Sequence, residues 1–168
     1  MVGCTTCANT CPTHAIRFPS LSPPDRPLLF VAGGTGFAPI KALIEQQLKL
    51  APQREMQLFW GMRDLNDCYA FGLIVAWARQ YPNLHIVLAA ERRLDALRVP
   101  HGVMVVDGNV TQALRQSPLP IAGHDAYVAG PPGMIPYVFD VLHDAGISAE
   151  HVVVDSFGLE LGENPRNE

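Results

Sequence analysis

Three cysteines near the amino terminus have the spacing of iron–sulfur ligands. Cys4, Cys7 and Cys11 are separated by two and three residues, and Pro12 follows the third. Runs of the form C-x2-C-x2-C-x3-C-P hold [4Fe–4S] clusters through their thiolates. The last three cysteines of such a run are present, and Met1 occupies the place of the first. The segment therefore predicts an incomplete set of metal ligands.

The remaining cysteine, Cys68, lies far from this run. It could complete the ligand set only if the amino-terminal segment folded back over it, and the alternative is a partly buried, inert thiol. Because such a cluster takes four thiolates, we expect the chain alone to hold no stable [4Fe–4S] cluster. The crowded spacing argues against a disulfide framework and favours a reducing compartment.

Two glycine-rich turns have the composition of phosphate-binding sites. GGTGFAP spans residues 33–39 after the apolar run LLFVA, and AGPPGM spans residues 129–134 after DAYV. Glycines let the backbone approach a phosphate, Thr35 adds a hydroxyl donor, and a helix amino end offers free N–H groups. Neither turn matches the G-x-G-x-x-G fingerprint. Each could be a turn without a ligand, but together they favour a dinucleotide at the edge of a sheet.

The elements that would position these turns alternate between strand and helix. Apolar runs predict strands at 28–32, 56–61, 84–90, 125–130 and 151–157, and helical spacing predicts helices at 38–51, 70–81, 109–116 and 134–146. Residues 101–108 fit a short strand or a buried loop. Asn109 suits a helix cap, and Pro39 suits a first turn. The alternation predicts an α/β fold, a mostly parallel sheet with helices on both faces, which binds ligands beyond the carboxyl ends of its strands.

Composition and charge limit the classes of partner. Of the residues, 48% are hydrophobic and 17% are charged, and the net charge is −4, which disfavours nucleic acid and anionic membranes. The longest apolar run, 71–78, is too short to span a bilayer, and no signal peptide is visible. These features predict a soluble, cytoplasmic domain.

Four motifs in order carry a family resemblance: LLFVAGGTGFAPIKALIE, LFWGMRDLNDCY, DAYVAGPPGM and VVDSF. Over residues 27–158 the chain resembles the pyridine-nucleotide domain of the ferredoxin–NADP reductase superfamily, particularly its bacterial oxygenase-reductase branch. The opening segment, with CPTHAI, resembles part of a bacterial ferredoxin. We therefore divide the chain into a truncated ferredoxin-like segment at 1–16, a linker at 17–26 and an NAD(P)-binding domain at 27–168.

The resemblance implies roles for both turns. The first would face the pyrophosphate and the nicotinamide side through Gly33, Gly34, Thr35 and Gly36. The nicotinamide ribose would cross the second, which holds Gly130, Pro131, Pro132 and Met134. We expect Gly36→Val to reduce nucleotide binding greatly and to leave the fold largely intact.

Two further positions bear on hydride transfer through the same resemblance. Relatives often carry a cysteine near the hydride-transfer site, where this chain has Ala129, and that difference counts against fast hydride transfer. Phe157 matches the aromatic side chain that shields the flavin ring. A buried core phenylalanine is the alternative for Phe157.

The residues after the second and third strands bear on the choice of nicotinamide cofactor. A carboxylate suits a free ribose hydroxyl pair, whereas serine or arginine suits a ribose phosphate. NADP-specific relatives tend to place Ser-Arg after the third strand, where this chain has Ala90 and Glu91, and this difference favours NADH. Arg63 could attract a phosphate, but Asp64 stands beside it, and Arg92 and Arg93 leave the choice open.

The resemblance implies a reductase that passes hydride from NADH to FAD, and then electrons to an iron–sulfur or oxygenase acceptor. Relatives carry the FAD on a β-barrel ahead of the nucleotide domain. Only 26 residues precede the nucleotide domain here, so we expect the FAD on a missing or separate domain or subunit. The alternatives are a nucleotide-binding module or subunit without catalysis, or a stable domain that has lost its ligand.

Overall fold

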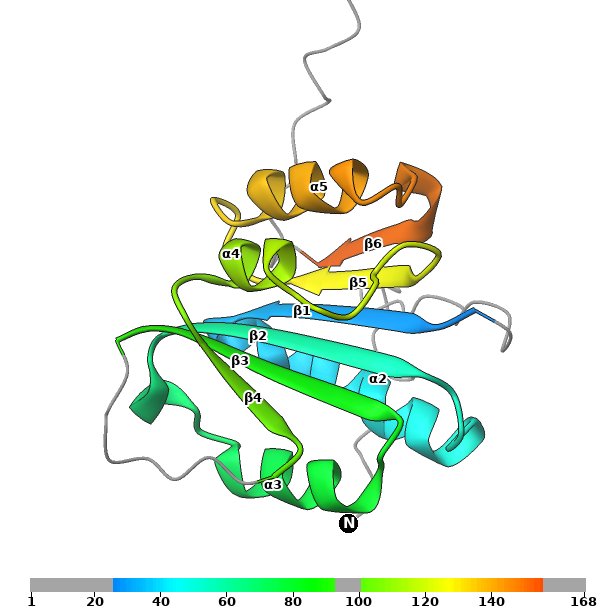
Figure 1. Ribbon diagram of the computed structural model, residues 1–168, viewed down its shortest axis with the longest axis vertical. Helices are drawn as coiled ribbons and strands as arrows, with labels where there is room; N and C mark the ends of the chain where they lie inside the picture. Colours follow the sequence, from blue (N-terminus) through cyan, green and yellow to red (C-terminus); the bar gives the residue numbers. More distant parts are fainter. Residues whose placement is uncertain (1–25, 93–100, 156–168) are drawn as a thin grey trace, which may run out of the picture.

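A six-stranded parallel sheet forms the centre of the structure, a computed structural model that describes residues 26–92 and 101–155. Figure 1 shows the strands in the order β4-β3-β2-β1-β5-β6. Their bounds are β1 Leu28–Gly33, β2 Met56–Asp64, β3 Leu84–Arg92, β4 Val103–Asp107, β5 Asp125–Ala129 and β6 Val152–Asp155. Every neighbouring pair in this sheet is parallel, so the predicted α/β fold is confirmed.

Helices cover both faces of the sheet, because parallel strands need crossover connections. Helices α2 and α3 pack on one face, and α4 and α5 pack on the other. The helices are α2 Phe37–Leu50, α3 Phe71–Gln80, α4 Val110–Arg115 and α5 Ile135–Asp144, and short 3-10 turns are η1 Gly34–Gly36, η2 Leu65–Asp67 and η3 Ala149–His151. None of the described helices is long and apolar enough to cross a bilayer. The cytoplasmic location stays a prediction.

Alternate residues of the central strands pack into two separate hydrophobic cores, one on each face of the sheet. Phe30 and Leu58 pack with α2 and α3, whereas their neighbours Val31 and Phe59 pack with α4 and α5. All four side chains are fully buried. Since side chains point to alternate faces of a strand, a continuously apolar run is what burial on both faces requires.

Residues 101–108, which the sequence left open between strand and loop, contain β4 at the edge of the sheet. This strand pairs with β3, with Val105 opposite Leu88. The predicted cap at Asn109 is also confirmed. Its Oδ1 accepts a hydrogen bond from the Gln112 backbone N–H at 3.0 Å, and Gln112 Oε1 accepts one from the Asn109 N–H at 2.9 Å. This reciprocal capping box fixes where α4 begins.

Two buried polar side chains, Gln57 and His124, lie at the amino ends of the strands, on the opposite edge from the glycine turns. Gln57 Nε2 donates to the Pro120 carbonyl oxygen at 3.0 Å and lies 3.2 Å from His124 Nε2. His124 Nδ1 lies 3.3 Å from the Ala122 carbonyl oxygen. A neutral His124 with its proton on Nδ1 satisfies both contacts. Burial lowers the pKa of His124 below its ordinary 6.5, and the charge of Arg26 acts in the same direction.

Acid should therefore destabilise the fold through His124. The stability that neutral His124 contributes is fully present above pH 6.5, the ordinary pKa of histidine. It declines as the pH falls toward the lower pKa of His124 in the folded state, because the unfolded chain then binds a proton that the folded chain does not. Urea unfolding from about pH 8 to about pH 5 measures this. His124→Gln should flatten the decline, whereas His143→Gln, on an exposed position of α5, should not. Equal pH slopes in wild type and His124→Gln would contradict the assignment.

Candidate functional site

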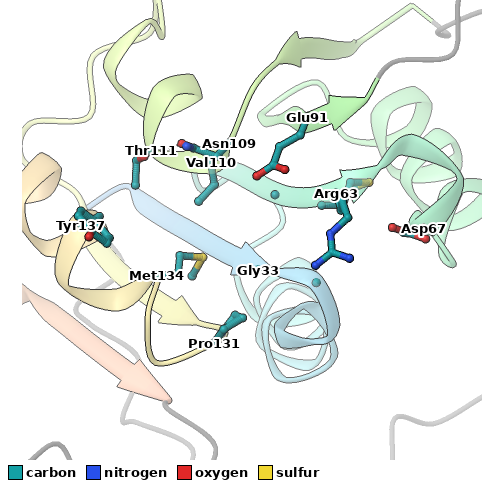
Figure 2. A pocket seen from close by; sticks show the side chains of 13 residues that line it. Gly33, Arg63, Asp67, Glu91, Asn109, Val110, Thr111, Pro131, Met134 and Tyr137 are labelled. Carbon is teal, nitrogen blue, oxygen red and sulfur yellow. Dashed lines mark hydrogen bonds between the residues drawn. The ribbon is translucent and has the colours of Figure 1, made fainter.

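A cleft of about 610 Å³ opens at the carboxyl ends of the strands. This is the edge where parallel sheets bind ligands, and the strand order reverses direction here between β1 and β5. The volume falls within the range of about 300–1,000 Å³ that is typical of small-molecule and cofactor sites. The residues that line it come from the ends of β1, β2 and β3, from η1 and η2, from the turn after β5, and from the starts of α4 and α5 (Figure 2). They are Gly33, Gly34, Gly61, Met62, Arg63, Asp67, Glu91, Asn109, Val110, Thr111, Pro131, Met134 and Tyr137.

The two glycine-rich turns meet at the centre of this cleft, because β1 and β5 are neighbours. A Cβ added to Gly33 would lie 2.6 Å from Met134 Sδ and 2.9 Å from Pro131 Cδ. A Cβ added to Gly130 would lie 2.6 Å from Met134 Cε and 3.1 Å from the Gly33 nitrogen. No side chain fits at either glycine without a shift, so glycine permits this close approach.

Six of the predicted cofactor-binding residues line the cleft: Gly33, Gly34, Arg63, Glu91, Pro131 and Met134. The others lie close to it in sequence but do not line it. Gly36 and Gly130 are buried behind the turns, Thr35 is exposed on η1, and Pro132 is half-buried. Pro39 lies in the first turn of α2, as expected.

Asp64, another predicted cofactor-binding residue, has a local structural role. Its carboxylate accepts a hydrogen bond from the Asn66 backbone N–H at 2.9 Å, and its own N–H donates to Asp67 Oδ2 at 3.2 Å. These two bonds cap η2. The acid of this loop that lines the cleft is Asp67.

Charged side chains stand on one side of the cleft. Arg63 and Glu91 come from the ends of neighbouring strands β2 and β3, and both are exposed (Figure 2). Asp67 lies beyond Arg63 in the same view. Arg63 is the one cation among the lining residues that the structure describes. The cleft thus offers one positive group for an anionic ligand, with carboxylates that can accept hydrogen bonds nearby.

Sequence reasoning missed the side of the cleft formed by the helix starts. Asn109, Thr111 and Tyr137 line it, but the sequence marked only Asn109, and only as a cap. Pattern along the chain gives no signal for their proximity. It follows from the sheet order, which carries α4 and α5 to the same face.

The predicted metal ligands fall outside the described residues. Cys4, Cys7 and Cys11 lie in the part of the chain that the structure leaves undescribed, as does Phe157. Cys68 is described, buried and free, and burial raises its pKa to about 11. Within residues 26–92 and 101–155, no group of three or more histidine, cysteine or acidic side chains is arranged to hold a metal ion.

The fold and this cleft define a nucleotide-binding domain, and comparison with known families agrees. Residues 30–140 match the family described as Oxidoreductase NAD-binding domain. The match spans more than half of the chain, so the chain belongs to this family. The expected relation to the ferredoxin reductase superfamily is confirmed. The ferredoxin-like segment ahead of it stays a prediction.

Individual relatives are reductase components of oxygenases. The chain is 33% identical over 139 residues to terephthalate 1,2-dioxygenase, reductase component 1, of Comamonas sp., which covers 82% of this chain and 40% of the relative. It is 31% identical over 133 residues to the ferredoxin–NAD(P)(+) reductase component of the naphthalene 1,2-dioxygenase system of Pseudomonas putida. This match covers 78% of this chain and 38% of the relative. A solved structure of an Amycolatopsis cytochrome P450 reductase matches with a TM-score of 0.67 and 25% identity. The match covers 82% of this chain and 40% of that structure's chain. The chain thus spans about two fifths of the length of these relatives.

Proposed function

We propose that the chain binds NADH across the cleft and presents its nicotinamide to an FAD carried by another domain or subunit. The observation that carries this proposal is the meeting of the two glycine-rich turns at the strand edge, where Gly33 lies against Met134 and Pro131. The backbone there leaves room for a pyrophosphate beside the start of α2, whose N–H groups carry a positive partial charge. Bound NADH would supply the hydride.

The chain's own residues would bind and orient the cofactor. Gly33 and Gly34 give close access to the backbone, and Arg63 places positive charge beside them. Pro131 and Met134 form the opposite wall, and the fixed φ of proline keeps that wall rigid. Glu91 would accept hydrogen bonds from a ribose hydroxyl pair.

NADH should bind more tightly than NADPH, because the Glu91 carboxylate would repel a phosphate on the ribose. Glu91→Gln keeps the shape and removes the charge. Isothermal titration should show the preference for NADH reduced by about tenfold in this variant, equivalent to about 1.4 kcal/mol. Asp140→Asn, which removes an exposed carboxylate of α5 outside the cleft, should keep the preference. Equal affinities in wild type, or tighter NADPH, would refute the assignment.

The flavin and the acceptor enter the proposal through the relatives, which are reductase components of oxygenase systems. NADH-dependent ferricyanide reduction tests the hydride step. We expect the chain with free FAD to be nearly inactive, and activity to appear when the flavin domain of a relative is added. No activity with that domain present would refute the reductase proposal. An iron–sulfur or oxygenase partner would then receive the electrons.

A second function, nucleotide binding without catalysis, is favoured by Ala129. Relatives often carry a cysteine at this position beside the hydride-transfer site, as the resemblance implies. Here the side chain is a buried methyl group at the end of β5. Tight NADH binding together with no ferricyanide reduction in the presence of a flavin domain would identify this second function.

A further inference from the structure

The carbonyl oxygen of Gly34, in the first glycine turn, is held by the neighbouring strand. Trp60 of β2 donates its indole Nε1–H to this oxygen at 2.9 Å. The Phe37 backbone N–H donates to the same oxygen from the start of α2. Trp60 is fully buried, whereas Gly34 is exposed, so this hydrogen bond joins the core to the surface turn. A core side chain thus reaches directly into the turn that lines the cleft.

An aromatic cluster fixes the direction of this indole. The rings of Phe37 and Trp60 stack with centroids 4.0 Å apart and planes 13° apart. Tyr69 packs edge-on against Trp60 at 5.2 Å. Stacked and edge-on contacts of this kind hold rings in defined orientations. Because the indole is held on two sides, its N–H stays aimed at the Gly34 oxygen.

The bond to the Gly34 oxygen also sets the direction of the next N–H. No cis peptide occurs in the described residues, and in a trans peptide the C=O and the following N–H point in opposite directions. The Gly34 oxygen faces the buried Trp60, so the Thr35 N–H faces away from the core. Thr35 is exposed and adjoins the lining residue Gly34. The outward N–H is therefore available to an anionic group in the cleft.

We propose that Trp60 is a positioning residue for nucleotide binding, which orients the Gly34–Thr35 peptide so that its N–H donates to the pyrophosphate. This inference rests on the proposed function. Gly34 has a φ of +51°, and glycine backbones rotate with little steric resistance, so the turn needs an outside contact to keep one conformation. Without the indole N–H, the peptide orientation that binds the pyrophosphate becomes one of several. The apparent affinity for NADH then falls in proportion to the fraction of molecules in that orientation.

Trp60→Phe tests this inference, because it keeps an aromatic ring in the stack and removes the donor. The matched control is Trp77→Phe, which also shrinks a buried ring packed edge-on against Phe37. We expect the NADH dissociation constant to rise about fivefold to tenfold in Trp60→Phe, in keeping with the net worth of one hydrogen bond, and to stay within about twofold in Trp77→Phe. Adenosine, which lacks phosphates, should bind wild type and Trp60→Phe equally.

Several outcomes would overturn the inference. NADH affinity in Trp60→Phe within about twofold of wild type would do so, as would an equal loss for NADH and adenosine, since that pattern means general loosening of the core. A wild-type chain that fails to bind NADH would overturn the proposed function and the inference together. Tight wild-type binding with an unaffected Trp60→Phe would overturn the inference alone.

A second measurement covers a Trp60→Phe chain that does not fold. The sequence has two tryptophans, so Trp77→Phe leaves one indole N–H signal in an amide correlation spectrum, that of Trp60. Titration with NADH should shift this signal and the Thr35 amide signal with one common midpoint. Failure of either signal to move while NADH binds would overturn the inference.

Discussion

Gly36→Val is expected to destabilise the fold severely. A Cβ at this position would meet the Ala129 carbonyl oxygen, and it would lie 2.6 Å from the Ala129 carbonyl carbon and 2.8 Å from the Gly130 nitrogen. All three atoms belong to the backbone at the end of β5, which cannot move without breaking its pairing with β1. We expect a loss of at least about 4 kcal/mol in the free energy of unfolding, a large part of the roughly 5–15 kcal/mol of a typical domain.

Circular dichroism and urea unfolding measure this effect, with Gly72→Ala as control. Gly72 lies in α3, and a Cβ there would meet no atom within 4 Å. Alanine is a better helix former than glycine, so the control should be as stable as wild type or up to about 1 kcal/mol more stable. A Gly36→Val chain that unfolds at the wild-type urea concentration would contradict the packing seen at Gly36.

The packing around Gly36 argues against the expectation from sequence that this substitution would reduce nucleotide binding and spare the fold. The expectation assumed that every glycine of the turn faces the ligand. The structure places Gly36 behind the turn, where it lets α2 start close to the end of β5. That contact joins residues more than ninety positions apart in the chain. Local pattern holds no information about which face of a turn meets a distant strand.

The layered fold was predictable because burial leaves a direct pattern in the residues. The LLFVA run is apolar at every position, as a strand covered on both faces must be, and it forms β1. Asn109 and Gln112 stand at capping-box spacing, and they begin α4. Residues 101–108 were ambiguous because β4 is an edge strand, half-buried, with Met104 exposed.

The site was predictable where its residues follow directly from strand ends. Arg63 and Glu91 come after buried strands, and parallel strands bring their carboxyl ends to one edge. Asp64 was predicted for the same reason, but its short side chain turns back to cap η2. Tyr137 had no signal, since its place on the cleft depends on the crossover that sets α5 beside α4. Strand order and helix packing are tertiary properties that a single sequence shows only indirectly.

Gly33→Val should leave the fold in place and close the cleft. Gly33 has extended backbone angles, φ −117° and ψ 118°, which valine adopts readily. Its Cβ would instead collide with Met134 Sδ at 2.6 Å and Pro131 Cδ at 2.9 Å. Met134 is flexible and can move aside, and Pro131 meets the new side chain with its ring, whereas at Gly36 the colliding atoms belong to the backbone. The displaced side chains line the cleft, so their movement should weaken ligand binding.

Accommodating a side chain in a packed site costs about 1–3 kcal/mol, so the NADH dissociation constant should rise by a factor of about 5 to 150. Gly133→Val is the matched control: it lies in the opposite turn, does not line the cleft, and its Cβ would meet no atom within 4 Å. Its affinity should match wild type. Adding Met134→Ala to the Gly33→Val chain should partly restore NADH binding, because it removes the nearest colliding atoms. The effects of the two substitutions should therefore not be additive. Undiminished affinity in a folded Gly33→Val chain would show that NADH does not bind across the place where the two glycine turns meet.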